Sequence, residues 1–480
     1  MEYLISGRKP EALFRFFEEI SAIPRGSGNE KAIADYIEHF AVSRQLFCVR
    51  DKENNVFVRK NGSEGRENEP ALLLQGHTDM VCEKNMDISH DFEKDPIRLI
   101  LENGWLRADG TTLGADDGVA VATMLAVLDG AMKSHPPIEC LFTTGEEVGL
   151  DGAKAFDYSL VSARRMINLD SEQEGYATVS CAGGVRTDLS LPMTKVPFAG
   201  EALEITLSGL AGGHSGAEIH LGRANANKLM GRLLYALCQT TKLHLALLTG
   251  GSKDNAIPRE SRAVIAVEPC DCAKVIEKVA HMATVFAAEL CEEDQGMKLV
   301  CRPTEKPSDM MDLATTQTAV AISVVVANGV LAMSRDIEGL VEYSRNLGVI
   351  QTSEKHVDYV FSSRSSVESR IDSSEEELSA LAAVTGCLCR HYSRYPGWQY
   401  EKVSSLRDRY AEVAPRVFGK TPVIEAIHAG LECGIIKSHI PDMDMISIGP
   451  DMKGIHSPDE KLELASCERL WVLLEQMMQA

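Results

Sequence analysis

The sequence is short of positive charge and has no long apolar run. Lys and Arg number 49 against 70 Asp and Glu, a formal net charge of −21. Nucleic acids and anionic membrane surfaces repel a protein of this charge, so neither is an expected partner. No stretch approaches the ~20 consecutive apolar residues that cross a bilayer. The opening residues, MEYLISGRKPEALF, have no basic flank ahead of an apolar core, so no secretory signal is expected.

The chain also lacks any Cys-x-x-Cys pair, a spacing typical of metal-binding and thiol redox motifs. Its 13 cysteines are scattered, and the nearest pairs are Cys270–Cys272 and Cys387–Cys389. An odd, unpatterned set of cysteines in a long chain is typical of reduced, buried thiols. We therefore expect a cytoplasmic protein.

A chain of 480 residues exceeds one ordinary core, so at least two domains are expected. Helical patterns alternate with short apolar runs at 71–75, 138–142, 164–169 and 444–449. The helical patterns include residues 10–20 and 118–132. Ser27 to Glu30 looks like a capping box that opens a further helix. This alternation predicts an α/β domain in which a mostly parallel sheet is flanked by helices.

The alternation changes between residues 186 and 398. The predicted order there is strand, helix, two strands, helix and strand, and a similar order returns after Pro303. The helices are expected at 217–239, 272–291, 313–327 and 374–391. We therefore predict an inserted α+β domain of two halves at 186–398. It divides the first domain into residues 1–185 and 399–480.

The four apolar runs lead into residues that can bind metal ions. The runs are followed, in order, by His77 with Asp79, by Glu146 with Glu147, by Asp170, and by the segment containing His456. Asp116 and Asp117 stand at the start of a predicted helix. Because ligands bind beyond the carboxyl ends of strands in open α/β sheets, we expect these side chains to meet. Each alone has a plainer interpretation, such as a helix cap, but the coincidence of four strand ends favours one site.

This number of imidazole and carboxylate groups favours two metal ions. The groups suit divalent zinc, cobalt or manganese, and they are too many for one tetrahedral ion with an open position. Two ions ~3.5–4 Å apart can share a bridging carboxylate and a bridging water. Of the adjacent acids Glu146 and Glu147, one can bind a metal while the other takes a proton from the water. Asp79 can hydrogen-bond the imidazole of His77 from behind.

The order of these motifs resembles that of a known family. The motifs are His77-Thr78-Asp79, Gly114-Ala115-Asp116-Asp117-Gly118, Gly145-Glu146-Glu147, Asn168-Leu169-Asp170 and His456. They are similar to those of the di-zinc exopeptidases and deacylases that include carnosinase-type dipeptidases. A resemblance to the aminoacyl-histidine (Xaa-His) dipeptidases extends over essentially the whole chain. It implies a zinc-peptidase-like catalytic domain and a lid domain, which is the insert.

The resemblance also implies roles for individual residues. The implied ligands of two zinc ions are His77, Asp116, Glu147, Asp170 and His456. Asp116 would bridge the two ions, Glu146 would be the general base, and Asp79 would orient His77. A strained peptide bond is expected beside Asp116. His214, which lies among glycines in the insert, would stabilise the oxyanion of the reaction.

Four further residues are candidates for holding a dipeptide. Arg364 can clamp a C-terminal carboxylate through two hydrogen bonds, and Asn255 lies in the run GGSKDNAIPRE. Gly430 and Glu432 lie in the run HAGLECG. We expect Gly430 to offer a backbone contact, and Glu432 to support the site from behind or to bind the substrate amine. A solvated surface position is the plainer alternative for Arg364 and Glu432.

These features predict a cytosolic di-zinc dipeptidase that prefers histidine on the carboxyl side, as in β-alanyl-histidine. Two alternatives keep the same metal site: an N-acyl-amino-acid deacylase and a tripeptide aminopeptidase. A catalytically silent metal-binding relative is disfavoured, because such a protein has no need of Glu146 as a base beside a ligand. A phosphoesterase is disfavoured because no Arg/Lys cluster stands ready for a phosphate.

The resemblance leaves the subunit arrangement open. Many relatives have a smaller lid and take the oxyanion histidine from a partner subunit. The insert at 186–398 is long enough for two such lids in one chain. We therefore predict that His214 serves the active site of its own chain, and that a homodimer is not needed to complete the site.

Overall fold

The computed structural model describes residues 3–479, which divide into two compact units. The first unit comprises Met1–Ser180, Tyr400–Ala426 and Leu431–Ala480, and the second comprises Cys181–Gln399 and Ile427–Gly430. In residues 3–479, no helix combines the length and the apolar character needed to cross a membrane.

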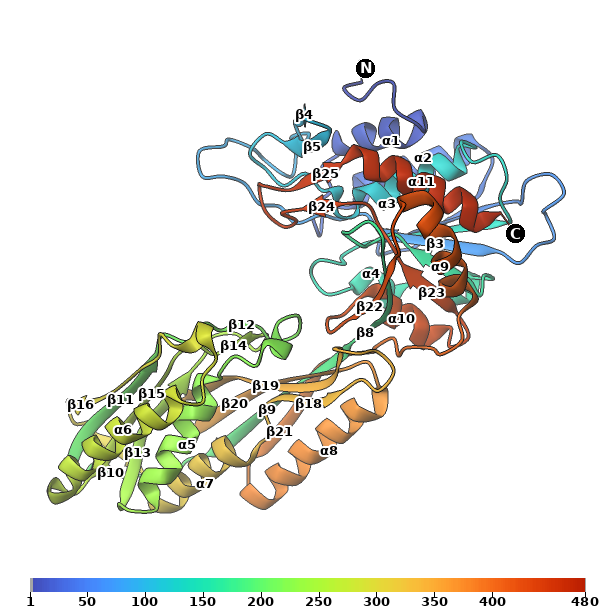
Figure 1. Cartoon of the computed structure of the whole chain (residues 1–480). Helices are drawn as coiled ribbons and strands as arrows, with labels where there is room; N and C mark the ends of the chain where they lie inside the picture. Colours follow the sequence, from blue (N-terminus) through green and yellow to red (C-terminus); the bar gives the residue numbers. More distant parts are fainter. Residues whose placement is uncertain (1–2, 480) are drawn as a thin grey trace. The chain divides into compact units, whose positions relative to one another are not determined.

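The first unit is built on an eight-stranded sheet (Figure 1). Its strands, in sheet order, are β1 (Phe47–Arg50), β2 (Val56–Lys60), β6 (Ile138–Thr143), β3 (Leu72–His77), β7 (Arg165–Asn168), β23 (Asp444–Ser447), β8 (Tyr176–Cys181) and β22 (Val423–Ile427). The four adjacent strands β6, β3, β7 and β23 run parallel, whereas β1, β2 and β8 pair antiparallel with their neighbours. The predicted fold class is confirmed, with the four central strands parallel.

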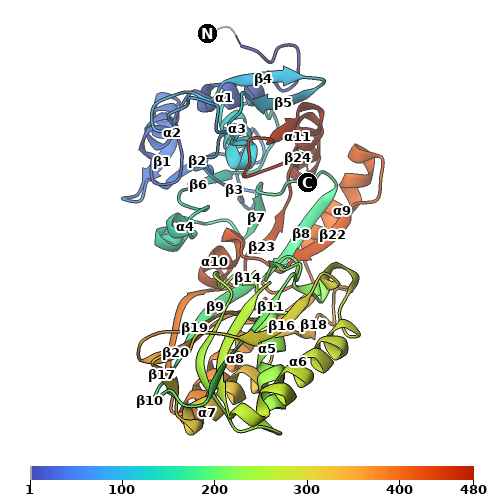
Figure 2. The same cartoon turned by 90° about the vertical axis from the view of Figure 1, so that its left-hand side faces the viewer.

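Helices and a smaller sheet complete the first unit. The helices are α1 (Glu11–Ser21), α2 (Lys31–Ser43), α3 (Ala115–Leu128), α4 (Asp151–Ala155), α9 (Ser405–Phe418), α10 (Glu432–His439) and α11 (Leu464–Met478). The smaller sheet joins β24 (Met452–Lys453), β25 (Lys461–Glu463), β5 (Trp105–Ala108) and β4 (Leu99–Glu102). Every residue of α3 is buried, and after its acidic first turn the sequence is almost entirely apolar, as a helix between α1 and β3 requires (Figures 1 and 2).

The second unit contains one antiparallel sheet of nine strands. In sheet order they are β16 (Lys298–Pro303), β11 (Glu201–Ser208), β15 (Ser261–Val267), β13 (Leu243–Gly250), β19 (Val341–Thr352), β20 (His356–Ser365), β9 (Gly183–Pro192) and β21 (Leu388–Tyr395), with β18 (Gly329–Met333) paired to β19. Helices α5 (Ala226–Cys238), α6 (Cys272–Ala287), α7 (Leu313–Val325) and α8 (Glu368–Thr385) cover one face (Figures 1 and 2). Two short ribbons pair β10 (Lys195–Pro197) with β17 (Asp309–Met311), and β12 (Gly213–His214) with β14 (Ala256–Ile257).

Eight strands of the nine-stranded sheet form two matching halves, and β18 has no counterpart. The first half has the chain order β11, α5, β13, β15, α6 and β16, and the second has β9, α7, β19, β20, α8 and β21. Corresponding strands occupy corresponding places in the sheet, and the halves join where β13 pairs with β19. The second half takes its first strand, β9, from before the first half in the chain. The prediction that the second half begins after Pro303 was therefore wrong for its first strand.

Three local predictions were also wrong, each because a polar group or a glycine acts differently. Helix α5 begins nine residues later than predicted, where Asn225 accepts hydrogen bonds from the backbone N–H groups of its first turn. Helix α8 ends at Thr385, before Gly386, whose φ of +74° is unfavourable for other residues, and β21 follows. The expected capping box at Ser27 is absent, because the Ser27 hydroxyl donates to Asp79 instead.

Candidate metal centre and substrate-binding cluster

The structure brings the five predicted metal ligands together in the first unit. His77 ends β3, Glu147 and Asp170 follow β6 and β7, and Asp116 lies in the first turn of α3. Ligand atoms lie within 4.8 Å of one another in three overlapping groups: His77 with Asp116 and Asp170, Asp116 with Glu147 and His456, and His77 with Glu146 and Glu147. The proximity expected from the strand ends is therefore present.

Asp116 is shared between two of these groups. Its Oδ1 lies 3.1 Å from Nε2 of His77, and its Oδ2 lies 3.1 Å from Nε2 of His456. Nε2 of His77 is also 3.7 Å from Oδ1 of Asp170, and Nε2 of His456 is 3.0 Å from Oε1 of Glu147. Each carboxylate oxygen of Asp116 thus faces one histidine and one further acid. This donor set fits a pair of divalent ions that share one carboxylate.

The electrostatics of the cluster also favour bound cations. Burial and the neighbouring acids raise the pKa of Glu146 to about 9. Burial, together with Asp116 and Glu147, raises the pKa of Asp170 to about 6, although His77 opposes the shift. Carboxylates crowded in a low-dielectric site repel one another, and bound cations are the usual compensation.

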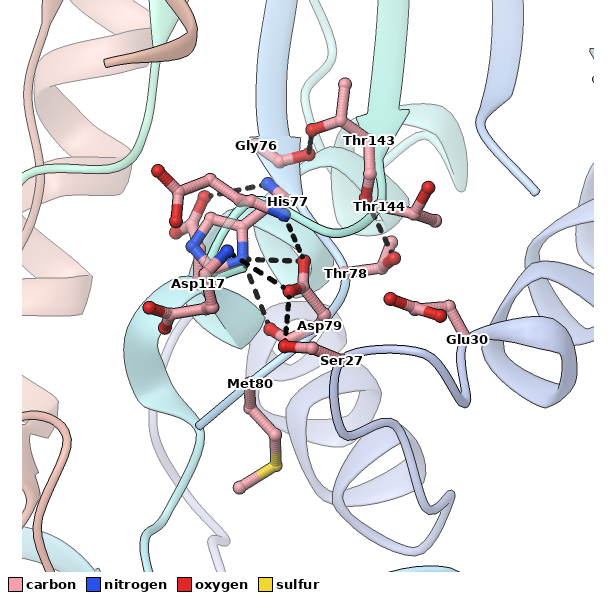
Figure 3. Close-up of polar contacts among 12 residues, drawn as sticks. Ser27, Glu30, Gly76, His77, Thr78, Asp79, Met80, Asp117, Thr143 and Thr144 are labelled. Carbon is pink, nitrogen blue, oxygen red and sulfur yellow. Dashed lines mark hydrogen bonds and ion pairs between the residues drawn. The ribbon is translucent and has the colours of Figure 1, made fainter. Parts of the chain in front are cut away.

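Asp79 contacts the ring of His77 (Figure 3) and also binds the backbone of the glutamate pair. Nδ1 of His77 lies 3.1 Å from the Asp79 carbonyl oxygen and 3.4 Å from its Oδ1. The Asp79 carboxylate also accepts the backbone N–H groups of Glu146, at 3.1 Å, and of Glu147, at 3.3 Å. Burial opposes ionisation, but the bonds from His77 and Ser27 lower the pKa of Asp79 to about 2. The ionised carboxylate therefore aligns the imidazole and both glutamates.

Ser27 was not predicted to contact this site, and Asp117 was expected near it without an assigned role. The Ser27 hydroxyl donates to Oδ2 of Asp79 at 2.8 Å, and Oδ2 of Asp117 accepts the backbone N–H of His77 at 3.2 Å (Figure 3). The peptide bond between Asp116 and Asp117 is cis, where the resemblance led us to expect an unusual peptide.

Glu460 holds the backbone that leads to Asp116. Its buried carboxylate accepts four backbone N–H groups, those of Leu113 at 2.8 Å, Gly114 at 3.0 Å, Ala115 at 2.7 Å and Asp116 at 3.3 Å. Glu460 stands four residues after His456, so it connects the segment of His456 with the segment of Asp116, two predicted metal ligands. Arg25 adds a second tie, since its guanidinium donates to the carbonyls of Thr78, Asp79 and Gly114. No motif in the sequence marks either residue.

We expect Glu460→Ala to lower both stability and metal affinity. Four buried N–H groups would lose one acceptor, and an unsatisfied buried group costs about 1–3 kcal/mol before water enters. Denaturant unfolding of the metal-free protein and competition with a chelator measure the two effects. Asp459→Ala is the matched control, because the neighbouring Asp459 is exposed. Equal behaviour of the two variants would contradict the role given to Glu460.

Predicted substrate residues gather in the second unit. A methyl group on Gly216 would lie 2.6 Å from the His428 carbonyl oxygen, 3.0 Å from Cε1 of His214 and 3.1 Å from Nε of Arg364. These three residues therefore surround Gly216, and only glycine fits there. Nη1 of Arg364 donates to the Tyr395 hydroxyl at 2.9 Å.

Gly430 and Asn255 adjoin the same cluster. A methyl group on Gly430 would lie 2.9 Å from the ring of Tyr395, the residue that binds Arg364. The carbonyl oxygen of Asn255 accepts the backbone N–H of Ser215 at 2.9 Å, beside His214. Asn255 makes this contact through its backbone, so the role of its side chain in binding the substrate stays a prediction.

His214 is held as one tautomer. Its Nδ1 accepts the backbone N–H groups of Ala217, at 3.0 Å, and Gly216, at 3.3 Å. Burial and the charge of Arg364 lower its pKa, so the ring is neutral near pH 7. The single ring proton must then lie on Nε2, which leaves an N–H free to donate.

His428 was missed, although it begins the run in which Gly430 and Glu432 were noticed. Its Nε2 lies 2.7 Å from the Ser344 hydroxyl, and burial and Arg364 lower its pKa to about 3. It is therefore a neutral neighbour of the His214–Arg364 cluster. Tyr395 was missed too, because nothing near it in the sequence indicates a contact with Arg364.

Glu432 does not belong to this cluster. It lies in the first unit, is fully buried, and accepts hydrogen bonds from Gln75 and Thr143 through Oε2. An acid in this position cannot meet a substrate amine without being uncovered. The solvated surface alternative is therefore wrong, and support of the site from behind is the interpretation that fits.

Comparison with known proteins assigns the family. A family model described as "Peptidase family M20/M25/M40" matches residues 73–480. The chain therefore belongs to this family and is a peptidase, a hydrolase, as the order of its motifs predicted.

Individual relatives cover nearly the whole chain. The chain is 38% identical over 477 residues to the cytosol non-specific dipeptidase of Escherichia coli (strain K12), covering 99% of this chain and 98% of that protein. The crystal structure of aminoacylhistidine dipeptidase from Vibrio alginolyticus matches with a TM-score of 0.94 and 36% identity, over 98% of this chain and 96% of that one. Aminopeptidase PepT from Bacillus cereus shares the fold, with a TM-score of 0.55 and 14% identity over 97% of this chain and 98% of that one.

Proposed function

We propose that this protein is a cytosolic metallodipeptidase that cleaves short dipeptides and prefers histidine on the carboxyl side, including β-alanyl-histidine. The names of its two whole-length relatives, a cytosol non-specific dipeptidase and an aminoacylhistidine dipeptidase, support this proposal. The observation that carries it is the Asp116 carboxylate, whose two oxygens each lie 3.1 Å from a different histidine. Metal analysis and a panel of dipeptides on the purified protein test it.

The same geometry suggests which residues hold each ion. His77, Asp116 and Asp170 would bind one, and Asp116, Glu147 and His456 the other. Zinc fits these donors best, and cobalt or manganese fits them too. Bound there, the two ions would polarise the scissile carbonyl and lower the pKa of the attacking water.

The chain's own groups would move the proton and hold the substrate. Glu146 would take the proton of the attacking water and pass it to the leaving amine, while Glu147 binds metal. His214 would donate from Nε2–H to the developing oxyanion, which its neutral tautomer allows. Arg364 would clamp the substrate carboxylate, and Asn255 and Gly430 would line the same cluster. Residues 186–398 would act as the lid that carries His214, Asn255 and Arg364.

An N-acyl-amino-acid deacylase and a tripeptide aminopeptidase remain the alternatives on the same centre. They differ from a dipeptidase in what the substrate must present at each end. We propose that the dipeptidase needs a free amine at one end and a free carboxylate, opposite Arg364, at the other.

We expect glycyl-histidine and β-alanyl-histidine to be cleaved well. Their N-acetylated forms, the corresponding tripeptide glycyl-glycyl-histidine and glycyl-histidinamide should be at least about 100-fold poorer in kcat/KM, because each change removes or displaces one of the two charged ends that the site would bind. The panel changes one end of a single parent peptide at a time. If N-acetyl amino acids were the best substrates, the deacylase alternative would replace this proposal.

A further inference from the structure

A row of buried polar side chains crosses the four parallel strands of the first unit. Thr143, Gln75, Asn168 and Ser447 lie on β6, β3, β7 and β23, which are successive neighbours in the sheet. All four are essentially inaccessible to solvent. Gln75 stands two residues before His77, and Asn168 two residues before Asp170, so the row lies one step behind the ligands along their strands.

The row is joined by hydrogen bonds that begin at Glu432. Oε2 of Glu432 accepts from Nε2 of Gln75 at 2.5 Å and from the Thr143 hydroxyl at 2.7 Å. With Nε2 of Gln75 so engaged, its Oε1 accepts from Nδ2 of Asn168 at 2.7 Å.

The bonds end at a predicted metal ligand. Oδ1 of Asn168 accepts from the Ser447 hydroxyl and, at 3.4 Å, from the backbone N–H of Asp170. Each side-chain amide has one donating end and one accepting end, so each bond fixes the direction of the next. A carboxylate has no donor of its own, and Glu432 therefore allows only one direction.

We propose that Glu432 is a positioning residue: it sets the direction of the hydrogen bonds through Gln75 and Asn168, and so holds Asp170 in place to bind a metal ion. The inference rests on the proposed metal centre. This role of Glu432 requires only that its Oε2 accept hydrogen bonds, which it can do in both the carboxylate and the carboxylic acid. Nε2 of Gln75 also donates to the Thr143 hydroxyl at 3.2 Å, and that hydroxyl accepts only while its own proton goes to Oε2 of Glu432. Without Oε2 the hydroxyl can turn its proton toward Gln75, the Gln75 amide can turn over so that its Nε2 meets Nδ2 of Asn168, and the Asn168 oxygen leaves the N–H of Asp170.

Two variants at one position test the direction of these bonds. Glu432→Gln removes the charge but can keep an acceptor where Oε2 stands, so zinc affinity should stay close to wild type. Glu432→Leu removes the acceptor, and the affinity for one of two zinc ions should fall about 10- to 100-fold, the usual cost of losing a ligand's outer hydrogen bond. Zinc stoichiometry and competition with a chelator are the measurements. Thermal unfolding of each metal-free variant checks folding.

A second pair of variants keeps the test decisive if Glu432→Leu does not fold. Gln75→Glu sets two acids against each other and should lower zinc affinity. The exchange Gln75→Glu with Glu432→Gln restores a donor facing an acceptor, leaves Asn168 in its original direction, and should recover the affinity.

The outcomes separate this inference from the proposed function. A wild-type protein that binds no pair of ions would overturn the proposed function and the inference with it. A wild type that binds two ions, with Glu432→Leu and Gln75→Glu unchanged in affinity, would overturn the inference alone. Equal losses in Glu432→Gln and Glu432→Leu would also overturn it, since charge would then be the cause. A raised KM for glycyl-histidine at unchanged zinc affinity would show instead that Glu432 meets the substrate amine.

Discussion

Glu146→Gln is expected to keep both metal ions and to lose about 10²–10⁴-fold in kcat, the usual contribution of a general base. Glu147→Gln is expected to lose metal, because Oε1 of Glu147 lies 3.0 Å from Nε2 of His456 in the group that would hold one ion. The two side chains are adjacent, and both approach His77 within ligand distance. The geometry alone therefore does not show which glutamate is the base and which is the metal ligand. The two substitutions distinguish these roles.

Zinc stoichiometry and kcat measured on the same preparations check this prediction. Asp151→Asn is the control, because Asp151 is an exposed acid on the same loop-and-helix segment and should change neither quantity. Equal metal loss in Glu146→Gln and Glu147→Gln would mean that both glutamates are ligands, and another group would then have to act as the base.

His214→Ala is expected to lower kcat about 10²–10³-fold with both metal ions retained, the usual cost of removing one oxyanion donor. The neutral ring with its proton on Nε2 is the basis of this expectation. We further expect His214 to act in its own chain. The second half of the nine-stranded sheet repeats the first, and it brings Arg364 of the same chain beside His214.

Mixing of inactive subunits tests this arrangement. His214→Ala chains are combined with Glu146→Gln chains under conditions that allow any dimer to exchange subunits. Activity should stay at the level of the parents if each active site uses its own histidine. A rise well above both parents would show that the histidine crosses between subunits. His281→Ala, which alters an exposed histidine of α6, should keep wild-type activity.

The fold class and the meeting of the predicted ligands follow from short-range patterns. Four apolar runs of strand length lead into His77, Glu146 and Glu147, Asp170 and, further on, His456. Parallel strands present their carboxyl ends at one edge, so residues that follow different strands become neighbours in space. The structure confirms the α/β fold, and the comparisons confirm the family. The roles of the individual ligands stay predictions until metal binding is measured.

Other features of the second unit could not be predicted from local sequence. Strand β9 lies between β20 and β21 in the sheet, although more than 150 residues separate it from β20 in the chain. An antiparallel sheet accepts such a strand wherever its apolar face matches the core, and periodicity carries no information about which neighbour it finds. Tyr395 likewise joins Arg364 only through this pairing, since both pair with Gly184 of β9.

By itself, the sequence determined the fold class, the edge of the sheet at which the ligands meet, and the chemistry that those ligands favour. Tertiary structure alone decided what holds them in place. Glu460 caps the start of α3 from 344 residues away, and Glu432 meets Gln75 from 357 residues away. Glu460 stands in no motif, and the run HAGLECG marked Glu432 without its partner, because only the folded chain brings the backbone N–H groups and the strand amide near these acids. Candidate ligands can be identified by residue type and spacing. The groups that position them depend on where distant segments pack.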